Sequence, residues 1–472
     1  MNILLINPSV YKTGYGRFKN LLEPMPCIGL AYICAILEKS GYSPTVIDNF
    51  VHNISNKEIL LKISKLKPAV IGISALTPSF SNIKQLLKEI RNQFPEIVLI
   101  LGNIHAEYCA KEILSEKTAD IIVNGEGEYT FKDIIATIEK EEDLSKIPGI
   151  SILKDGNFHK TPNRPPITDL DKLPLPSWHL FPYKKYGFFM GLGKPADKPI
   201  LSILASRGCP YRCDFCSTVY STWKHYRKRD PRKVVEEILF LIDRYKVKML
   251  GFMDSEFPMD KDHAHKVLDL MIEANMGEKI TWLTETRVDC VDQVILNKMK
   301  KAGCTKILYG FESGNQKFLD LVNKKITIDQ SYRAVKMTKN AGILPVGLFM
   351  IGFPGETKKD IIKTFKFACD LNIDYAKFSI LTPMPGSILF DRLKKEGKLK
   401  HFDWKNYTTF NPSPENFVYH PEQVQPEELI KLQKKGLRMF YLHPKRIYNH
   451  LFKIKSLSLS DMLNGAINML FN

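Results

Sequence analysis

The chain has 472 residues, of which 44% are hydrophobic and 25% are charged, a composition typical of two or three packed domains. No apolar run approaches the roughly 20 residues that cross a bilayer. The opening MNILLINPSV is typical of a buried strand and not of a secretion signal. We therefore expect a cytoplasmic protein, in which grouped cysteines are more often metal ligands or redox groups than disulfides.

Residues 1–160 alternate strands and helices as a doubly wound, Rossmann-like parallel sheet does. The expected strands are MNILLINPS, SPTVIDNF, AVIGISALT, IVLILGN and DIIVNGEGE, and the expected helices lie near 29–40, 56–65, 82–93 and 106–115. Ligands of such sheets bind at the carboxyl ends of the strands. The candidate binding residues there are Ser74, Leu76, Thr77, Gly102, Asn103 and Gly125. No GxGxxG follows the first strand, so a dinucleotide is not favoured.

Residues 161–198 form a proline-rich segment with little periodicity. This composition predicts an ordered linker between two domains. Leu173, Trp178 and Phe181 are the side chains expected to hold the linker against both domains.

The stretch SRGCPYRCDFCSTVY places Cys209, Cys213 and Cys216 in one short loop of a chain with nine cysteines. A zinc site usually has four protein ligands in two separated pairs, and the other cysteines are scattered singly. A [4Fe-4S] cluster held by three cysteines keeps one iron open for a small molecule. The spacing CxxxCxxC therefore favours such a cluster.

Residues 199–395 repeat strand and helix, and polar residues follow the apolar strands. Helices are expected near 261–276, 291–302, 327–341 and 357–371. In a parallel barrel the carboxyl ends of the strands carry the chemistry. The pattern predicts a partial (β/α) barrel of the TIM type that opens with the cysteine loop.

The cysteine loop, with the aromatic Phe215 before its last cysteine, resembles the signature of radical S-adenosylmethionine (SAM) enzymes. The resemblance implies a barrel of six βα units and an open iron that binds the amino and carboxylate groups of SAM. One electron then breaks the sulfonium bond and gives methionine and a 5'-deoxyadenosyl radical. An electron donor such as ferredoxin or flavodoxin is implied as a partner.

The same resemblance implies roles for residues at the strand ends, although each carboxylate taken singly is as often a solvated loop residue or a helix cap. The expected contacts are Asp254 and Glu256 with the SAM amino group, Glu285 and Arg287 with its carboxylate or sulfonium end, Gly310, Glu312 and Ser313 with the ribose, and Gly352 and Pro354 with the adenine.

The first domain, joined to this barrel, is similar to the cobalamin-binding domain of class B radical SAM enzymes. Ser74 to Leu76 resemble the SxL element of corrinoid folds, and Gly102-Asn103 stands where such folds have two glycines. The DxHxxG motif is missing, so the resemblance implies cobalamin without a lower histidine ligand from the first loop. His105 is either a residue over the corrin or a core contact. A cobalamin-free coupling or rearrangement enzyme is the alternative.

Residues 396–472 are predicted to form a helical, basic extension that carries much of the formal net charge of +17. From Leu429 to Ser460 lysines and arginines alternate with aromatic and aliphatic residues, and no acidic residue occurs. A basic helix with an apolar face suits the inner surface of an anionic membrane, and a solvated face of a helix bundle explains the pattern equally well. Nucleic acid is a rival partner.

The resemblance implies hydrogen abstraction from an unactivated carbon, followed by methylation through cobalamin or by ring or bond formation. The apolar, basic extension beside the barrel favours a hydrophobic substrate such as a lipid, an isoprenoid or a tetrapyrrole-like compound. The rival is a radical SAM methylthiotransferase that modifies tRNA. Cys27, Cys34 and Cys109 do not match the second cluster of that class, and the helical extension does not match its β-barrel, so nucleic acid is not expected.

Overall fold

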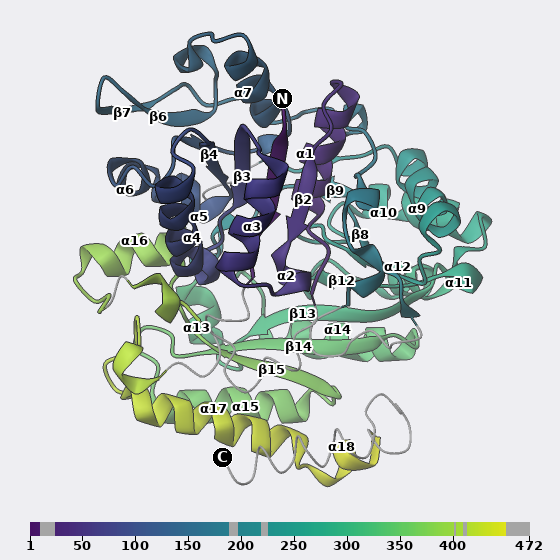
Figure 1. Ribbon diagram of the computed structural model, residues 1–472. Coiled ribbons are helices and arrows are strands. Elements are labelled where there is room, and N and C mark those ends of the chain that lie inside the picture. The colour runs from purple at the N-terminus through teal and green to yellow at the C-terminus, as the bar shows by residue number, and fades with distance from the viewer. Residues whose placement is uncertain (10–23, 188–196, 219–224, 401–402, 409–412, 450–472) are drawn as a thin grey trace.

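The computed structural model describes residues 1–9, 24–187, 197–218, 225–400, 403–408 and 413–449. It contains two large sheets, each packed against helices, with the C-terminal helices below the second sheet in the view of Figure 1.

The first sheet has seven strands in the order β2-β1-β3-β4-β5-β6-β7. The parallel strands are β1 (Ile3–Asn7), β2 (Thr45–Asp48), β3 (Val70–Ser74), β4 (Val98–Gly102) and β5 (Ile121–Val123). Most of their side chains are buried, as continuous apolar strands covered on both faces require. The doubly wound sheet is confirmed. The antiparallel strands β6 (Ile150–Lys154) and β7 (Asn157–Lys160), which extend the sheet beyond β5, were not expected.

The four predicted helices of this domain lie close to their expected positions, and α2 (Asn49–His52) and α7 (Gly127–Glu139) were not predicted. The predicted helices are α1 (Ile28–Lys39), α3 (Asn56–Leu66), α4 (Phe80–Gln93) and the pair α5 (Ile104–Tyr108) and α6 (Ala110–Ser115). The single helix expected at 106–115 is two short helices that meet at Cys109. Ser55 and Glu58 form a reciprocal capping box that fixes the start of α3.

The linker is packed against both domains. Trp178 and Phe181 are buried as expected, whereas Leu173 is only partly buried. The Ser177 backbone N–H donates to the carbonyl of Ala31 at 3.1 Å, and the Tyr186 hydroxyl donates to Asp48.

The second sheet has six parallel strands in the order β15-β14-β13-β12-β11-β8, which confirms the six-unit partial barrel. The strands are β8 (Ile200–Ile203), β11 (Met249–Phe252), β12 (Thr281–Thr286), β13 (Cys304–Glu312), β14 (Leu344–Ile351) and β15 (Tyr375–Ile380). The helices are α9 (Pro231–Tyr245), α10 (Lys261–Glu273), α11 (Met276–Lys279), α12 (Gln293–Lys301), α13 (Gln316–Leu321), α14 (Ile328–Asn340), α15 (Lys358–Asp370) and α16 (Ile388–Lys395).

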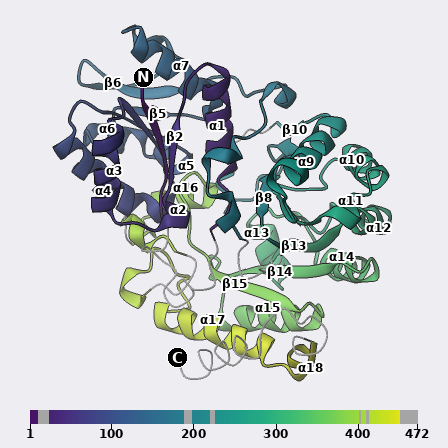
Figure 2. The ribbon, with the colours of Figure 1, turned by 45° about the vertical axis from the view of Figure 1, so that its right-hand side comes forward.

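The C-terminal extension is helical in its described part, with α17 (Pro426–Tyr441) and α18 (Pro444–Tyr448). Figures 1 and 2 both show α17 lying along α15. Leu429, Leu432 and Phe440 of α17 are buried. The apolar face of α17 is therefore covered by the barrel and does not face a membrane.

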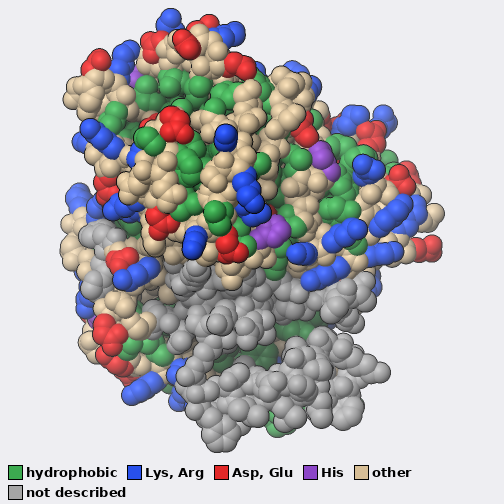
Figure 3. Space-filling view, viewed as in Figure 1, with side chains coloured by type: hydrophobic (Ala, Val, Ile, Leu, Met, Phe, Trp, Pro, Cys, Tyr) green, Lys and Arg blue, Asp and Glu red, His purple; other side chains and the backbone are tan. Residues whose placement is uncertain are grey.

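The remaining basic and aromatic residues of the predicted membrane-binding segment, 450–460, lie outside the described residues. Lys and Arg side chains are also spread over the face seen in Figure 3, including the region of α11 and α12. The positive charge of the chain is thus not confined to its C-terminal extension. None of the described helices combines the length and apolar character that a membrane crossing needs.

Candidate active site

A cavity of about 390 Å³ lies between the strand ends of the first sheet and the start of the barrel. Four of the six predicted binding residues of the first domain line it, namely Ser74, Gly102, Asn103 and Gly125. The barrel contributes Leu204, Ser206, Arg207, Gly208 and Met253. Of the other two predicted residues, Leu76 is exposed and Thr77 is buried, and neither lines the cavity.

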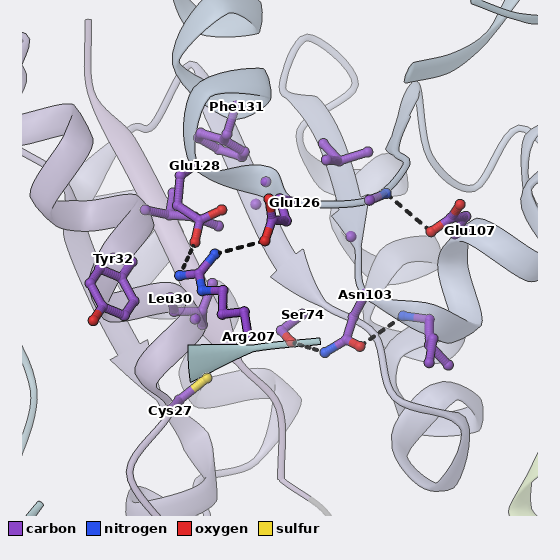
Figure 4. A pocket seen from close by; sticks show the side chains of 18 of the residues that line it. Cys27, Leu30, Tyr32, Ser74, Asn103, Glu107, Glu126, Glu128, Phe131 and Arg207 are labelled. Carbon is purple, nitrogen blue, oxygen red and sulfur yellow. Dashed lines mark hydrogen bonds and ion pairs between the residues drawn. The ribbon is translucent and has the colours of Figure 1, made fainter. Parts of the chain in front are cut away.

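Asn103 shapes the floor of this cavity (Figure 4). Its φ of +81° lies in a region that favours glycine, so the backbone bends as the expected second glycine would allow. Its side-chain amide donates to Ser74 Oγ at 3.1 Å, and its oxygen accepts from the Ile104 N–H at 2.7 Å. Asn103 therefore presents an amide and holds the Ser74 hydroxyl at the cavity edge.

A buried charge network forms the opposite wall (Figure 4). Arg207 lies between Glu126 at 3.1 Å and Glu128 at 2.7 Å. Glu126 also accepts from Arg227 at 2.9 Å, and Arg227 donates to the linker carbonyl of Ile167. Burial raises the pKa of Glu126, but the hydrogen bond from Arg227 and the charge of Arg207 outweigh it, so the pKa is lowered. The network joins both domains and the linker directly before the cysteine loop.

His105 is a core contact and not a residue over the cavity. It is fully buried, its Nδ1 lies 3.1 Å from Thr77 Oγ1, and its ring packs 4.1 Å from Phe80 and 4.7 Å from Trp404 of the extension. Burial lowers its pKa to about 3, so the ring is neutral. Cys34 is also a core residue, whereas Cys27 lines the cavity.

Three barrel residues, Asp254, Arg287 and Asn323, contact the cysteine loop or the chain just before it. Asp254 accepts from the Ala205 N–H and the Ser206 hydroxyl, so both of its carboxylate oxygens are used on the chain before the loop. Tyr211 stacks on the guanidinium of Arg287 at 3.6 Å. The Asn323 amide donates to the Arg212 carbonyl at 2.9 Å.

The three thiols of the loop lie close enough together for the charge of one to raise the pKa of another. Burial raises the pKa of Cys209 to about 11, and the charges of Glu256 and of the other two loop thiols add to the rise. Burial raises the pKa of Cys213 too, against the opposing charges of Lys324 and Arg287. Across the described residues, no three Cys, His, Asp or Glu side chains form a ready metal site. The residues fit an iron-sulfur cluster by their chemistry. Three sulfur donors lie on one loop, and the buried cations Lys324 and Arg287 lie near Cys213.

Glu256 and Lys324 lie close enough to the loop for their charges to influence Cys209 and Cys213. Glu256 Oε2 is buried and makes no hydrogen bond, and burial raises the pKa of this carboxyl to about 7. Lys324 is buried, pairs with Glu312 at 2.8 Å and lies 5.8 Å from the ring of Phe215. Sequence analysis missed Lys324 because it belongs to the turn after α13 and not to a strand end.

Gly310 is required by this ion pair. A Cβ at Gly310 would lie 2.5 Å from Glu312 Oε1 and 2.9 Å from Lys324 Nζ. The missing side chain therefore lets the pair lie against strand β13. Ser313, in contrast, is fully buried and bonds Thr364, so the structure gives it a packing role.

The segment after β14 turns on two glycines with positive φ, Gly352 at +94° and Gly355 at +73°. Glu356 Oε2 accepts from the backbone N–H groups of Gly352 and Phe353, which fixes the turn around Pro354.

The barrel interior is open above an apolar floor. The floor consists of Ile200, Met249, Leu283, Leu308, Val346 and Tyr375. On four of these strands the residue two positions later keeps contact with solvent, namely Glu285, Gly310, Leu348 and Lys377. Glu285 therefore lies in the barrel interior, where burial raises the pKa of its carboxyl group against the opposing charge of Lys377.

Fold and site together define a radical SAM barrel joined to a corrinoid-type domain, and comparison with known proteins agrees. Residues 203–368 match the radical SAM superfamily, and residues 18–135 match the B12 binding domain. The chain is 31% identical to an uncharacterised methyltransferase of Pyrococcus horikoshii over 94% of both chains. It is 30% identical to the anaerobic magnesium-protoporphyrin IX monomethyl ester cyclase of Rubrivivax gelatinosus, over 94% of this chain and 78% of that one.

Among solved structures, the radical SAM methyltransferase TsrM of Kitasatospora setae, with cobalamin and a [4Fe-4S] cluster bound, shares the fold. Its TM-score is 0.72 at 17% identity, over 94% of this chain and 89% of that one.

The chain belongs to the cobalamin-binding radical SAM enzymes. It is an enzyme of the methyltransferase or cyclase type whose cofactors are a [4Fe-4S] cluster, SAM and cobalamin. The tRNA methylthiotransferase alternative finds no support, because the first domain matches a B12 binding domain and the described extension is helical. The cobalamin-free alternative is disfavoured by the same match.

Proposed function

We propose that this enzyme methylates an unactivated carbon of a hydrophobic substrate bound in the barrel interior. The observation that carries the proposal is the cavity between the two domains, which opens toward the chain entering the cysteine loop through Ser206, Arg207 and Gly208. When bound, the cluster and SAM supply a 5'-deoxyadenosyl radical and cobalamin supplies a methyl group.

The chain's own residues would hold these groups in a fixed order. Cys209, Cys213 and Cys216 would ligate the cluster, and Arg207 would fix the chain entering their loop. The residues proposed for cobalamin are Ser74, Gly102, Asn103 and Gly125, which line the cavity.

For SAM, the unpartnered Glu256 Oε2 suits the amino group, and Lys324 suits the carboxylate. The turn at Gly352 and Pro354 would accept the adenine. Asp254 would act through the backbone that it holds, because its oxygens already accept two hydrogen bonds.

The substrate class follows from the open barrel interior. Its floor is apolar, so a substrate with an apolar body removes the most surface from water there. The cyclase relative acts, by its name, on magnesium-protoporphyrin IX monomethyl ester. A tetrapyrrole-like, lipid or isoprenoid substrate is proposed on these grounds. Contact with a membrane surface is proposed only through residues 450–472.

The cluster assignment is tested by anaerobic reconstitution with iron and sulfide. Wild-type protein reduced with dithionite is expected to convert SAM to 5'-deoxyadenosine, and C213A should abolish the reaction because it removes a sulfur ligand. The matched control is C369A, since Cys369 is a partly buried thiol near the end of α15. Unchanged turnover by C213A would contradict the assignment.

An isotope label on the methyl group of SAM distinguishes methylation from ring closure. The reduced enzyme is incubated with an apolar extract of cells that lack the gene and with SAM whose methyl group carries deuterium. Methylation predicts a new product that contains the labelled methyl group. A new product without the label would establish ring or bond formation instead.

A further inference from the structure

In the described part of the cysteine loop, Pro210 and Arg212 are exposed, and Arg212 is the charged one of the two. Arg212 is exposed, whereas the adjacent Cys213 is buried. The loop is fixed here by two backbone contacts, since the Arg212 carbonyl accepts from Asn323 at 2.9 Å and the Asp214 N–H donates to Val322 at 2.9 Å. A molecule that contacts Arg212 therefore lies next to the residue that directly precedes Cys213, a proposed cluster ligand.

Two further exposed cations lie on α13 and the turn after it, the segment whose Asn323 bonds the Arg212 carbonyl. Lys325 is exposed in the turn after α13, and its carbonyl accepts from Arg287. Lys317 is exposed on α13 itself and lies over the ring of Phe318 at 5.4 Å. We call Arg212, Lys317 and Lys325 the loop patch.

The three side chains of the loop patch are not engaged in ion pairs within 4.0 Å in the described part of the chain. The neighbouring carboxylates have other partners: Asp289 pairs with Arg287, Asp320 accepts from Gln316 and Asp214 faces Arg392 at 3.7 Å. Burial raises the pKa of Asp360, but hydrogen bonds from Thr357 and the charge of Lys317 outweigh it, so the pKa is lowered.

We propose that the loop patch is the docking surface for an acidic protein that carries single electrons. The proposal rests on the radical SAM activity, which needs one electron for each SAM that is cleaved. On docking, the carrier is oxidised by one electron, and the cluster held by Cys213 receives that electron. No proton is transferred and no bond is formed or broken in this step.

Charge complementarity is the physical reason for this partner. A cluster of unpaired cations attracts an acidic partner and raises the rate of encounter, and salt weakens the effect. An electron carrier must also approach the cluster closely, and Arg212 is an exposed residue of the loop, next to the buried Cys213. An apolar small molecule gains nothing from such a surface.

The test compares two electron sources on one holoenzyme. Production of 5'-deoxyadenosine is measured with reduced flavodoxin, regenerated by its reductase and NADPH, and separately with dithionite. The double variant R212E/K325E reverses two charges of the loop patch. With limiting flavodoxin its rate should fall about tenfold or more, because opposite charges now repel. With dithionite its rate should stay within about twofold of wild type.

The matched control is K62E/K65E, which reverses two exposed lysines on α3. This control should behave as wild type with both reductants, and raised salt should slow only the flavodoxin reaction of wild type and control. An R212E/K325E variant that keeps its flavodoxin rate would overturn the proposal. So would equal losses with both reductants at unchanged iron content, or a matching loss in the control. Absence of 5'-deoxyadenosine from wild type with dithionite would instead refute the underlying activity.

Discussion

Single residues in this enzyme owe their roles to neighbours that are remote in the chain. Asp254 follows β11, as the pattern predicted, but its oxygens are bonded to Ala205 and Ser206. Lys324 belongs to a turn, yet it pairs with Glu312 beside the cysteine loop. Strand-end position is visible in a sequence because it depends on local periodicity. The partner of each side chain is not, because it depends on how the barrel closes.

The fold of the barrel buries the carboxyl group of Glu356 and raises its pKa. The side chain is fully buried, and it accepts two backbone hydrogen bonds through Oε2 while Oε1 has no partner. Burial raises its pKa from 4.5 to about 8. Between these values the folded chain holds a proton that the unfolded chain has lost, so stability falls as pH rises toward 8.

We expect E356Q to remove this pH dependence. The amide oxygen of glutamine can accept both N–H groups but carries no titrating proton. Between pH 6 and 8 wild type should lose about 1–2 kcal/mol more stability than E356Q, as shown by thermal or urea unfolding of the two proteins. Parallel stability curves over this pH range would show that Glu356 is ionised in the folded state.

At the scale of elements, periodicity predicted most helices to within a few residues, including α10, α12, α14 and α15. The helices α7, α9, α13 and α16 were not predicted, and two further features were missed or left undecided. The β6–β7 hairpin follows the parallel strands but reverses direction, and its strands carry no signal for the pairing partner. The apolar and basic pattern of α17 suited a membrane as well as a barrel, and only the packed structure separates the two.

Gly436 decides how closely α17 packs on α15. A Cβ at this position would lie 2.4 Å from Cε1 of Phe365, whose side chain is fully buried. In an exposed helix, glycine to alanine gains about 1 kcal/mol. Here the overpacking cost of roughly 1–3 kcal/mol should exceed that gain.

We therefore expect G436A to destabilise the protein by about 1 kcal/mol, measured by urea unfolding against wild type. The control K435A changes an exposed neighbour on the same helix and should stay within about 0.5 kcal/mol. A stabilised G436A would mean that α17 packs less tightly than the structure shows.

At the scale of the whole molecule, the two sheets present their strand ends to each other across the interdomain cavity. The doubly wound sheet and the six-unit barrel were predictable, because each is a regular repeat of local elements. The charge network of Arg207, Glu126 and Glu128 was not, because its members are separated by about 80 residues in the chain. It joins the two domains beside the cofactor cavity.

Cobalamin binding in the interdomain cavity is the central claim, and a steric probe at Gly102 tests it. Gly102 lines the cavity, and among the described residues a Cβ there would meet only Val123 at an ordinary 3.7 Å. G102A should therefore keep the cavity, whereas the phenylalanine ring of G102F should fill it. Both variants are compared with wild type by circular dichroism to confirm folding.

The decisive measurement is the cobalamin retained per chain after incubation with hydroxocobalamin and anaerobic gel filtration. We expect close to one equivalent for wild type and G102A, and a loss of about tenfold or more for G102F, because a filled cavity excludes the corrin. Equal retention by folded G102F and wild type, or none by wild type, would contradict the claim.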